Sequence, residues 1–216
     1  MVEGGHPWPI YDLRIRSGRL ELRLPTEVEL LELLEVARSG IHDPAVTPFA
    51  FPWTDAPSPL LERSFMQYHW RTRGSWSPEK WMLDFGVWDD GRLIGVQGIG
   101  GDDFRVKRSV HTGSWLTRAE QGHGIGKEMR NAILAFAFDH LGAQWATSSA
   151  FLDNAASSGV SRSLGYVEDG YDVAAPRLEP RLLMRYRMSA EQWRSRQRPA
   201  VEVSGLEACR DLFGAE

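Results

Sequence analysis

Residues 121–127, Gln-Gly-His-Gly-Ile-Gly-Lys, form a glycine-rich turn that leads directly into an apolar run over residues 128–141. Glycine reaches left-handed backbone angles that bring several N–H groups to one point. The first turn of a helix adds unpaired N–H groups and the positive end of the helix dipole. Residues 110–117, just before the turn, have the pattern of a strand. The sequence therefore predicts a strand, a turn suited to holding phosphate, and a helix.

Two common anion-binding loops do not fit this turn. A P-loop has four residues between its outer glycines and a Ser or Thr after its Lys. Here Gly122 and Gly126 enclose three residues, and Glu128 follows Lys127. The dinucleotide fingerprint is G-x-G-x-x-G after the first strand, whereas this turn is G-x-G-x-G and lies well into the chain. Both are poor matches.

A second block of residues makes the turn more specific. Asn154 and Ser157 stand three residues apart, and Leu-Gly-Tyr-Val-Glu-Asp-Gly follows over residues 164–170. With Gln121, Gly124 and Gly126 in the pattern Q/R-x-x-G-x-G/A, the two blocks resemble the motifs of the GNAT superfamily of N-acetyltransferases. The second block is similar to the N-x-x-S…L-G-F-x-x-x-G signature of its RimJ/RimL-like branch.

The resemblance extends over roughly residues 19–188. The start around Trp8 and the tail around Cys209 resemble a mycobacterial and actinobacterial subgroup, some members of which are thought to use succinyl-CoA. The resemblance implies an acetyl-CoA or succinyl-CoA donor and an amine acceptor: a protein N-terminus, a lysine or a small-molecule amine. It divides the chain into an acyltransferase domain, 1–188, and an extension, 189–216, that packs on the domain or on a partner subunit of a possible homodimer.

Periodicity agrees with an α/β (α+β) fold. Residues 19–24 alternate as a strand, a capping box begins a helix at residues 26–29, and a second helix is expected over 59–73. Strands over 81–88 and 92–99 flank a hairpin turn, and a third follows over 109–117. A buried helix, a strand over 144–151, a helix over 154–164 and strands over 166–174 and 181–188 complete the order β-α-α-β-β-β-α-β-α-β-β. The prediction is a mixed sheet of about seven strands flanked by about four helices. In the family the two parallel strands splay apart and pantetheine enters the gap.

Acyl transfer to an amine requires a bound pyrophosphate, a stabilised carbonyl oxygen, a neutral amine and a way to accommodate the leaving thiolate. The resemblance implies that the glycine turn binds the pyrophosphate. It assigns the carbonyl to the Leu116 N–H, with sheet-like bonds from Trp115 and Thr117 to pantetheine, and a contact with CoA to Asn154. The predicted donor-binding residues are Trp115, Leu116, Thr117, Gln121, Gly122, His123, Gly124, Ile125, Gly126, Lys127, Asn154 and Ser157.

Two residues are predicted to be catalytic. His111 stands where this branch often has a carboxylate, two residues before Gly-x-Trp, and an imidazole with a pKa of ~6.5 is a suitable base. The alternative is a half-buried strand histidine that bonds a neighbour. Ser161 replaces a tyrosine that many members use, so Ser157 is expected to hydrogen-bond the thiolate or relay a proton. The alternative is that Asn154 and Ser157 only cap their helix.

Composition excludes several other functions. The net charge is −4 with no block of five or more like charges, which argues against non-specific nucleic-acid binding. The single cysteine suits a reducing cytoplasm, and no apolar run reaches the ~20 residues that span a bilayer. Histidine spacing gives no support for a metal site. A protein that binds CoA without catalysis remains the main alternative.

Overall fold

A computed structural model describes residues 6–215 of the chain. The described part contains one nine-stranded sheet with the order β7-β8-β6-β5-β4-β3-β2-β1-β9. Neighbouring strands are antiparallel except β5 and β6, which α4 connects as a parallel pair. The strands are β1 (Arg14–Ser17), β2 (Leu20–Arg23), β3 (Lys80–Asp89), β4 (Arg92–Asp102), β5 (Ser109–Leu116), β6 (Trp145–Phe151), β7 (Val167–Ala174), β8 (Arg181–Ser189) and β9 (Glu202–Ser204).

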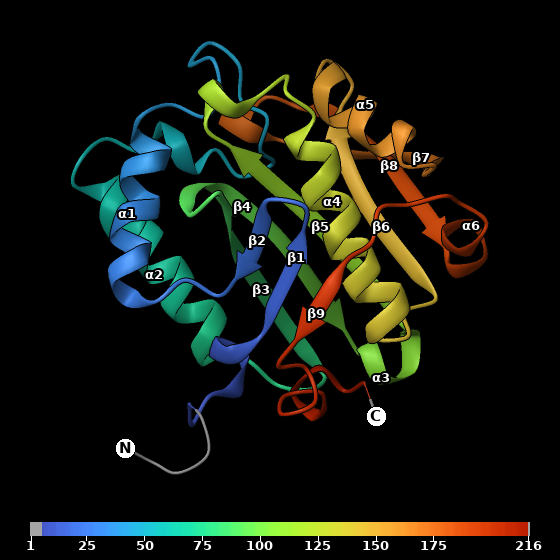
Figure 1. The fold of residues 1–216 in the computed structure, drawn as a ribbon. Helices are drawn as coiled ribbons and strands as arrows, with labels where there is room; N and C mark the ends of the chain where they lie inside the picture. The colour runs from blue at the N-terminus through green and yellow to red at the C-terminus, as the bar shows by residue number, and fades with distance from the viewer. Residues whose placement is uncertain (1–5, 216) are drawn as a thin grey trace.

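Helices cover both faces of this sheet. Helix α4 crosses one face, in front of β5 and β6 in Figure 1. Leu116 of β5 packs in the core beneath α4, whereas its neighbour Trp115 packs with side chains of α1 and α2. Because successive side chains of a strand point to opposite faces, α1 and α2 cover the other face. The helices are α1 (Glu27–Arg38), α2 (Leu60–Gly74), α3 (Phe104–Lys107), α4 (Ile125–Ala135), α5 (Ala155–Ser163) and α6 (Ala190–Arg194).

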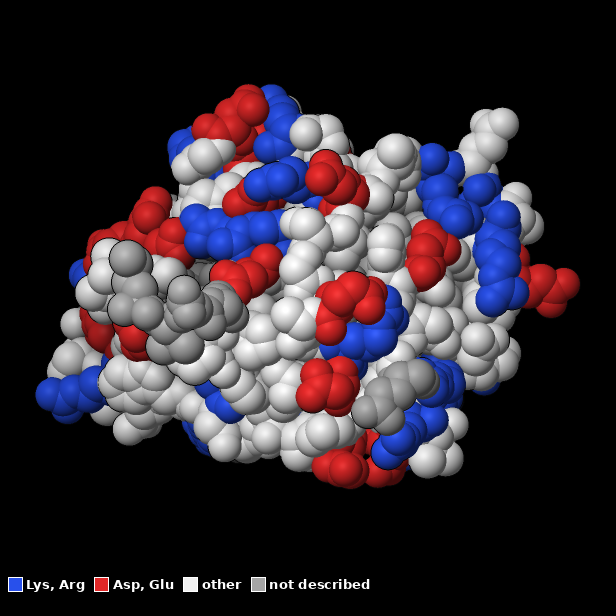
Figure 2. Space-filling view, turned by 60° about the horizontal axis from the view of Figure 1, so that its bottom comes forward, with Lys and Arg blue, Asp and Glu red and all other residues white. Residues whose placement is uncertain are grey.

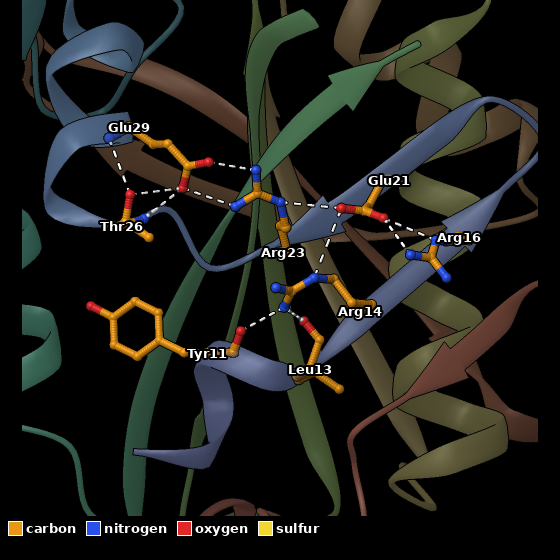
Figure 3. A network of polar contacts seen from close by, with 8 residues as sticks. All are labelled: Tyr11, Leu13, Arg14, Arg16, Glu21, Arg23, Thr26 and Glu29. Carbon is orange, nitrogen blue, oxygen red and sulfur yellow. Dashed lines mark hydrogen bonds and ion pairs between the residues drawn. The ribbon is translucent and has the colours of Figure 1, made fainter. Parts of the chain in front are cut away.

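An ionic network joins α1 to the β1–β2 hairpin (Figure 3). Glu21 accepts hydrogen bonds from Arg16 and Arg23, and Arg23 also donates two to Glu29. Glu29 completes the predicted capping box, in which it accepts from the Thr26 N–H and donates its own N–H to the Thr26 hydroxyl. The bonds from Arg23 lower the pKa of Glu29 to about 2. The network fixes the start of α1 against the sheet.

Surface charges of opposite sign are mostly interspersed. In the view of Figure 2, most Lys and Arg side chains lie among Asp and Glu side chains, and several basic side chains adjoin one another along the right-hand edge. Among the described residues, no helix combines the length and apolar character needed to cross a membrane.

The predicted α/β fold with a mixed sheet is confirmed, but the sheet is larger than the expected seven strands. The β1 and β9 strands were missed because strands of three or four residues carry almost no periodic signal. The apolar run after the glycine turn was expected as one helix, and it divides into α4 and a π-helical turn, Phe136–His140. In residues 189–215, α6 buries Trp193 and β9 pairs with β1.

Candidate active site

The two parallel strands separate along most of their length. The β5–β6 ladder contains three residue pairs, from Ser109 opposite Trp145 to His111 opposite Thr147. Beyond them, β5 continues to Leu116 and β6 to Phe151. The gap therefore begins just after His111 and opens toward the carboxyl ends of both strands, which are followed by the N-termini of α4 and α5.

The glycine turn stands at the open end of this gap. Gly122 and Gly124 have φ of 80° and 85°, left-handed values that favour glycine. Gly124 is the N-cap of α4 and supplies no side-chain cap. Within the described chain, the five N–H groups from Gly122 to Gly126 donate to no protein acceptor. Successive amides freed in this way, together with the helix dipole, form a site for an anion such as a diphosphate.

The side chains of the turn have separate roles. Gln121 donates its amide N–H groups to the carbonyls of Ile41 and Leu116, at 2.8 Å each, and so anchors the turn to β5. His123 and Lys127 are exposed, whereas Ile125 is buried in the core under α4. The main-chain N–H groups of this turn can therefore hold a phosphate group without a side-chain ligand.

The main chain of β5 directs alternate amides into the gap. The Thr117 N–H donates to the Ile94 carbonyl of β4, at 3.0 Å. Because amide direction alternates along a strand, the Ser114 and Leu116 N–H groups point to the opposite side, toward β6. The Leu116 N–H, which was predicted to bind the carbonyl oxygen, therefore points into the gap, while Trp115 and Thr117 direct their N–H groups to β4. Ser114 was not predicted, although its spacing of two from Leu116 would have pointed to it.

Helix α5 begins on the other side of the opening. Asn154 is its N-cap, and its side-chain oxygen accepts a hydrogen bond from the Ser157 N–H at 3.1 Å. The two residues thus form the helix cap that was the alternative to a role in catalysis. Ser157 is half-buried. Ser161 is 1% exposed and its Oγ has no hydrogen-bond partner in the described chain, so it faces the core rather than solvent.

A cleft of about 930 Å³ lies on the face of the sheet that α1 and α2 cover. Its floor includes Asp84, His111, Gly113 and Ser114 from β3 and β5. Its walls carry aromatic side chains from the loop before α2 and from α2 itself. These wall residues are Phe49, Phe51, Trp53, Phe65, Tyr68 and His69. The cleft therefore joins an apolar enclosure to a few titratable groups.

His111 lies at the point where the strands separate, with its imidazole on the cleft floor. Gly100 of β4 pairs with it, and a Cβ at Gly100 would lie 2.4 Å from the imidazole Cε1 and Nε2 atoms. The imidazole is open to solvent through the cleft but closely surrounded by protein. Desolvation by the surrounding protein lowers the pKa of His111, and the nearby charge of Asp102 acts in the opposite direction. The ring is therefore neutral, and able to accept a proton, at physiological pH.

Asp84 is a second titratable group on the floor, and sequence analysis missed it. Desolvation raises the pKa of Asp84 to about 6, and a hydrogen bond from Tyr68 and the charge of Arg73 oppose this shift. The pKa of Tyr68 is raised, first by burial and then by the Asp84 charge. The sequence did contain a sign of this site, because Asp84 is the single carboxylate in the apolar strand Trp-Met-Leu-Asp-Phe-Gly-Val-Trp.

Two arginines hold the aromatic wall of the cleft in place. Arg177, after β7, donates to the Asp55 carboxylate and to the Pro44 carbonyl. Arg181, at the start of β8, donates to the Thr47 carbonyl at 2.9 Å and to Asp153. We call Arg177 and Arg181 the arginine clasp. It ties the β7–β8 hairpin to the proline-rich loop that carries Phe49, Phe51 and Trp53.

Comparison with known families agrees with this arrangement. Residues 19–167 match the acetyltransferase (GNAT) domain family. The chain belongs to this family. In this GNAT acetyltransferase, the glycine turn lies at the open end of the β5–β6 gap.

Solved structures similar to this GNAT chain have low sequence identity and share its fold. RimL, a ribosomal alpha-N-protein acetyltransferase in complex with coenzyme A, is 16% identical with a TM-score of 0.64, over 80% of this chain and 95% of that one. Mycobacterium smegmatis RimJ in complex with CoA-disulfide is 16% identical with a TM-score of 0.65, over 85% and 90%. A SpeG spermidine N-acetyltransferase chimera from Vibrio cholerae and hSSAT is 16% identical with a TM-score of 0.64, over 83% and 100%.

Proposed function

We propose that this protein transfers an acyl group, acetyl by default, from acyl-CoA to a primary amine by direct attack of the amine on the thioester. The observation that carries the proposal is the set of unpaired N–H groups from Gly122 to Gly126 at the open end of the β5–β6 gap. Main-chain donors at a helix N-terminus suit a diphosphate. The gap beyond them suits an extended arm, because β5 rises roughly 17 Å between His111 and Leu116.

Donor and acceptor would meet where the gap reaches the cleft. Ser114 and Leu116 N–H groups can stabilise charge on the carbonyl oxygen, because preorganised donors in a sheltered site favour the developing oxyanion. His111 and Asp84 are both candidates for removing the amine proton, since burial lowers the pKa of His111 and raises that of Asp84 to about 6. We also propose that Asn154 and Ser157 line the donor side of the opening, with Ser157 near the departing sulfur.

The acceptor is proposed to be a primary amine with an apolar portion. Amines such as the lysine side chain are protonated at neutral pH, with a pKa of ~10.4. Asp84 on the floor would attract such a cation, and the aromatic wall would pack on its apolar part. The names of RimL and the SpeG chimera include protein N-termini and spermidine as acceptors, so α-amines, lysines and polyamines form the first test panel.

Succinyl-CoA is the alternative donor. A succinyl group ends in a carboxylate, and two cationic side chains, Arg71 and Lys80, line the same cleft. Lys80 pairs with Asp102 at 3.1 Å, so it is partly neutralised. Parallel assays with acetyl-CoA and succinyl-CoA would identify the donor by kcat/KM.

The decisive experiment combines binding and turnover. Calorimetry with CoA should give saturable heat that is lost when Gly124 is replaced by Val, since Val disfavours the left-handed φ at this position. Release of free thiol from acetyl-CoA or succinyl-CoA with the amine panel should follow. Binding without thiol release from any amine would support the non-catalytic CoA-binding protein, and no binding at all would refute both.

A further inference from the structure

Arg130 is a buried charge that the mechanism above does not use. It lies in the second turn of α4, faces the sheet and is 4% exposed. Its guanidinium donates to three neutral oxygens: Gln97 Oε1 at 3.3 Å, and Ser114 Oγ and Ser148 Oγ at 3.0 Å each. No carboxylate of the described residues forms an ion pair with it. A buried charge without a counter-charge is costly, so its retention requires an explanation.

The position of Arg130 relates it to the gap. Ser114 belongs to β5 and Ser148 to β6, and both come after the last residues that pair the two strands. Arg130 therefore bridges the strands where they have already separated, on the α4 face. Ser114 also lines the cleft on the opposite face. The buried cation and the cleft thus approach the same part of the gap from its two sides.

Tyr166 adds a second buried polar group, whose hydroxyl forms no hydrogen bond of accepted geometry within the described residues. It is 5% exposed and lies beside Arg130 and Thr112. A buried hydroxyl without a partner costs about 1–3 kcal/mol. A cation without an anion and a donor without an acceptor, side by side, together suit one negatively charged acceptor atom.

We propose that Arg130 and Tyr166 form a binding site for the thiolate that leaves when the acyl group is transferred. The proposal rests on the proposed function. The amine nitrogen forms the new C–N bond, the C–S bond breaks, and its electron pair stays on sulfur. The amine proton goes to the base on the cleft floor. Arg130 stabilises the thiolate by its charge, Tyr166 donates a hydrogen bond to it, and solvent supplies a proton after release.

Other charged groups near this site do not replace Arg130. Arg196 faces Tyr166 from the segment after α6. His111 is the titratable group on the cleft side, influenced by Asp102 and Lys80. None of these is held between β5 and β6 as Arg130 is. The thiolate should therefore respond most strongly to replacement of Arg130.

The test measures the pKa of the thiol of bound CoA. Thiolate absorbance is titrated with pH in the CoA complex, with desulfo-CoA as the blank. Free CoA titrated in parallel gives the reference pKa, and the complex should titrate about one unit or more lower, with about tenfold more thiolate relative to thiol at a given pH. Arg130→Met should return the titration to the free value. Arg162→Met, which removes an exposed cation on α5, should leave it unchanged.

Tyr166→Phe provides a second variant for this test in case the Arg130 variant does not fold. Because a buried hydroxyl without a partner is itself costly, its removal should not lower the melting temperature, whereas it should raise the thiol pKa and reduce kcat about tenfold with KM for the amine unchanged. Identical thiol titrations in the wild type and both variants would overturn the thiolate site while leaving the acyltransferase intact. Failure of CoA to bind the wild type would instead refute the proposed function, and the thiolate site with it.

Discussion

One added methyl group can distinguish the two candidate bases. On β4, Gly98 pairs with Asp84 of β3 and Gly100 pairs with His111 of β5, and neither glycine has a positive φ, so their backbones accept alanine. At Gly100 the new Cβ would lie 2.4 Å from two atoms of the His111 ring. At Gly98 it would lie 2.7 Å from Asp84 Oδ1. Each substitution therefore displaces one candidate base without changing the ionisable group itself.

The size of each displacement sets the expected effect. Ordinary van der Waals contact with a Cβ begins at 3.4 Å, so the His111 ring must move by about 3.4 − 2.4 = 1.0 Å and the Asp84 oxygen by about 3.4 − 2.7 = 0.7 Å. Misplacement of a reacting group by about 1 Å can cost about 10²-fold in rate. If His111 is the base, Gly100→Ala should lower kcat about 10²-fold, and Gly98→Ala should change it by only a few-fold.

Steady-state thiol release with the preferred amine measures both variants. Gly74→Ala serves as the control, because a Cβ there meets nothing within 4 Å and the residue lies outside the cleft. Met82 approaches both new methyl groups at 2.9 Å, so Met82→Leu identifies any loss that the two variants share. The reverse pattern would assign the base to Asp84. If kcat stays within a few-fold of wild type in both variants, neither side chain acts as the base.

Three further predictions concern pH, stability and the donor site. The kcat/KM should rise with pH and level off above about pH 6, because His111 and Asp84 accept a proton only when deprotonated. If Asp84 causes the rise in the pH–rate profile, Asp84→Asn should abolish that rise. The pKa of Glu29 is lower in the folded than in the unfolded state, so its contribution to the free energy of unfolding is complete above about pH 4.5 and lost as the pH falls toward 2. In urea titrations, Glu29→Gln should therefore lower the free energy of unfolding by about 2 kcal/mol at pH 7 and by less at low pH. Phe213→Ala, a fully buried ring, should cost about 3–5 kcal/mol of unfolding free energy in the same measurement.

Each of these predictions has an outcome that contradicts it. A pH–rate profile that is flat from pH 5 to 8 would exclude Asp84, whose pKa is about 6, as the base. An equal loss for Glu29→Gln at pH 7 and pH 3 would show that its charge does not stabilise the fold. A wild-type free energy of unfolding for Phe213→Ala would mean that the C-terminal segment is not part of the cooperative core.

The fold could be read largely from the sequence because its main elements have strong local signals. The capping box at Thr26, the hairpin turn at Asp90 and the glycines of the α4 turn each require a specific backbone conformation. The sequence also located the turn that is proposed to bind the donor, because the free N–H groups of that turn follow from its glycines. Asp84 and Arg130 were missed because their significance depends on desolvation and on distant partners. Such properties arise only when strands far apart in sequence are assembled.

The arginine clasp means that the width of the acceptor entrance is set from the far edge of the sheet. Arg177 and Arg181 belong to the β7–β8 hairpin, yet they hold the loop that supplies Phe49 and Trp53. β8 also pairs with β6, one side of the donor gap. Acceptor selectivity can therefore be altered by residues that never touch the acceptor. Relatives with a shorter hairpin would need another support for the same loop, or would admit bulkier amines.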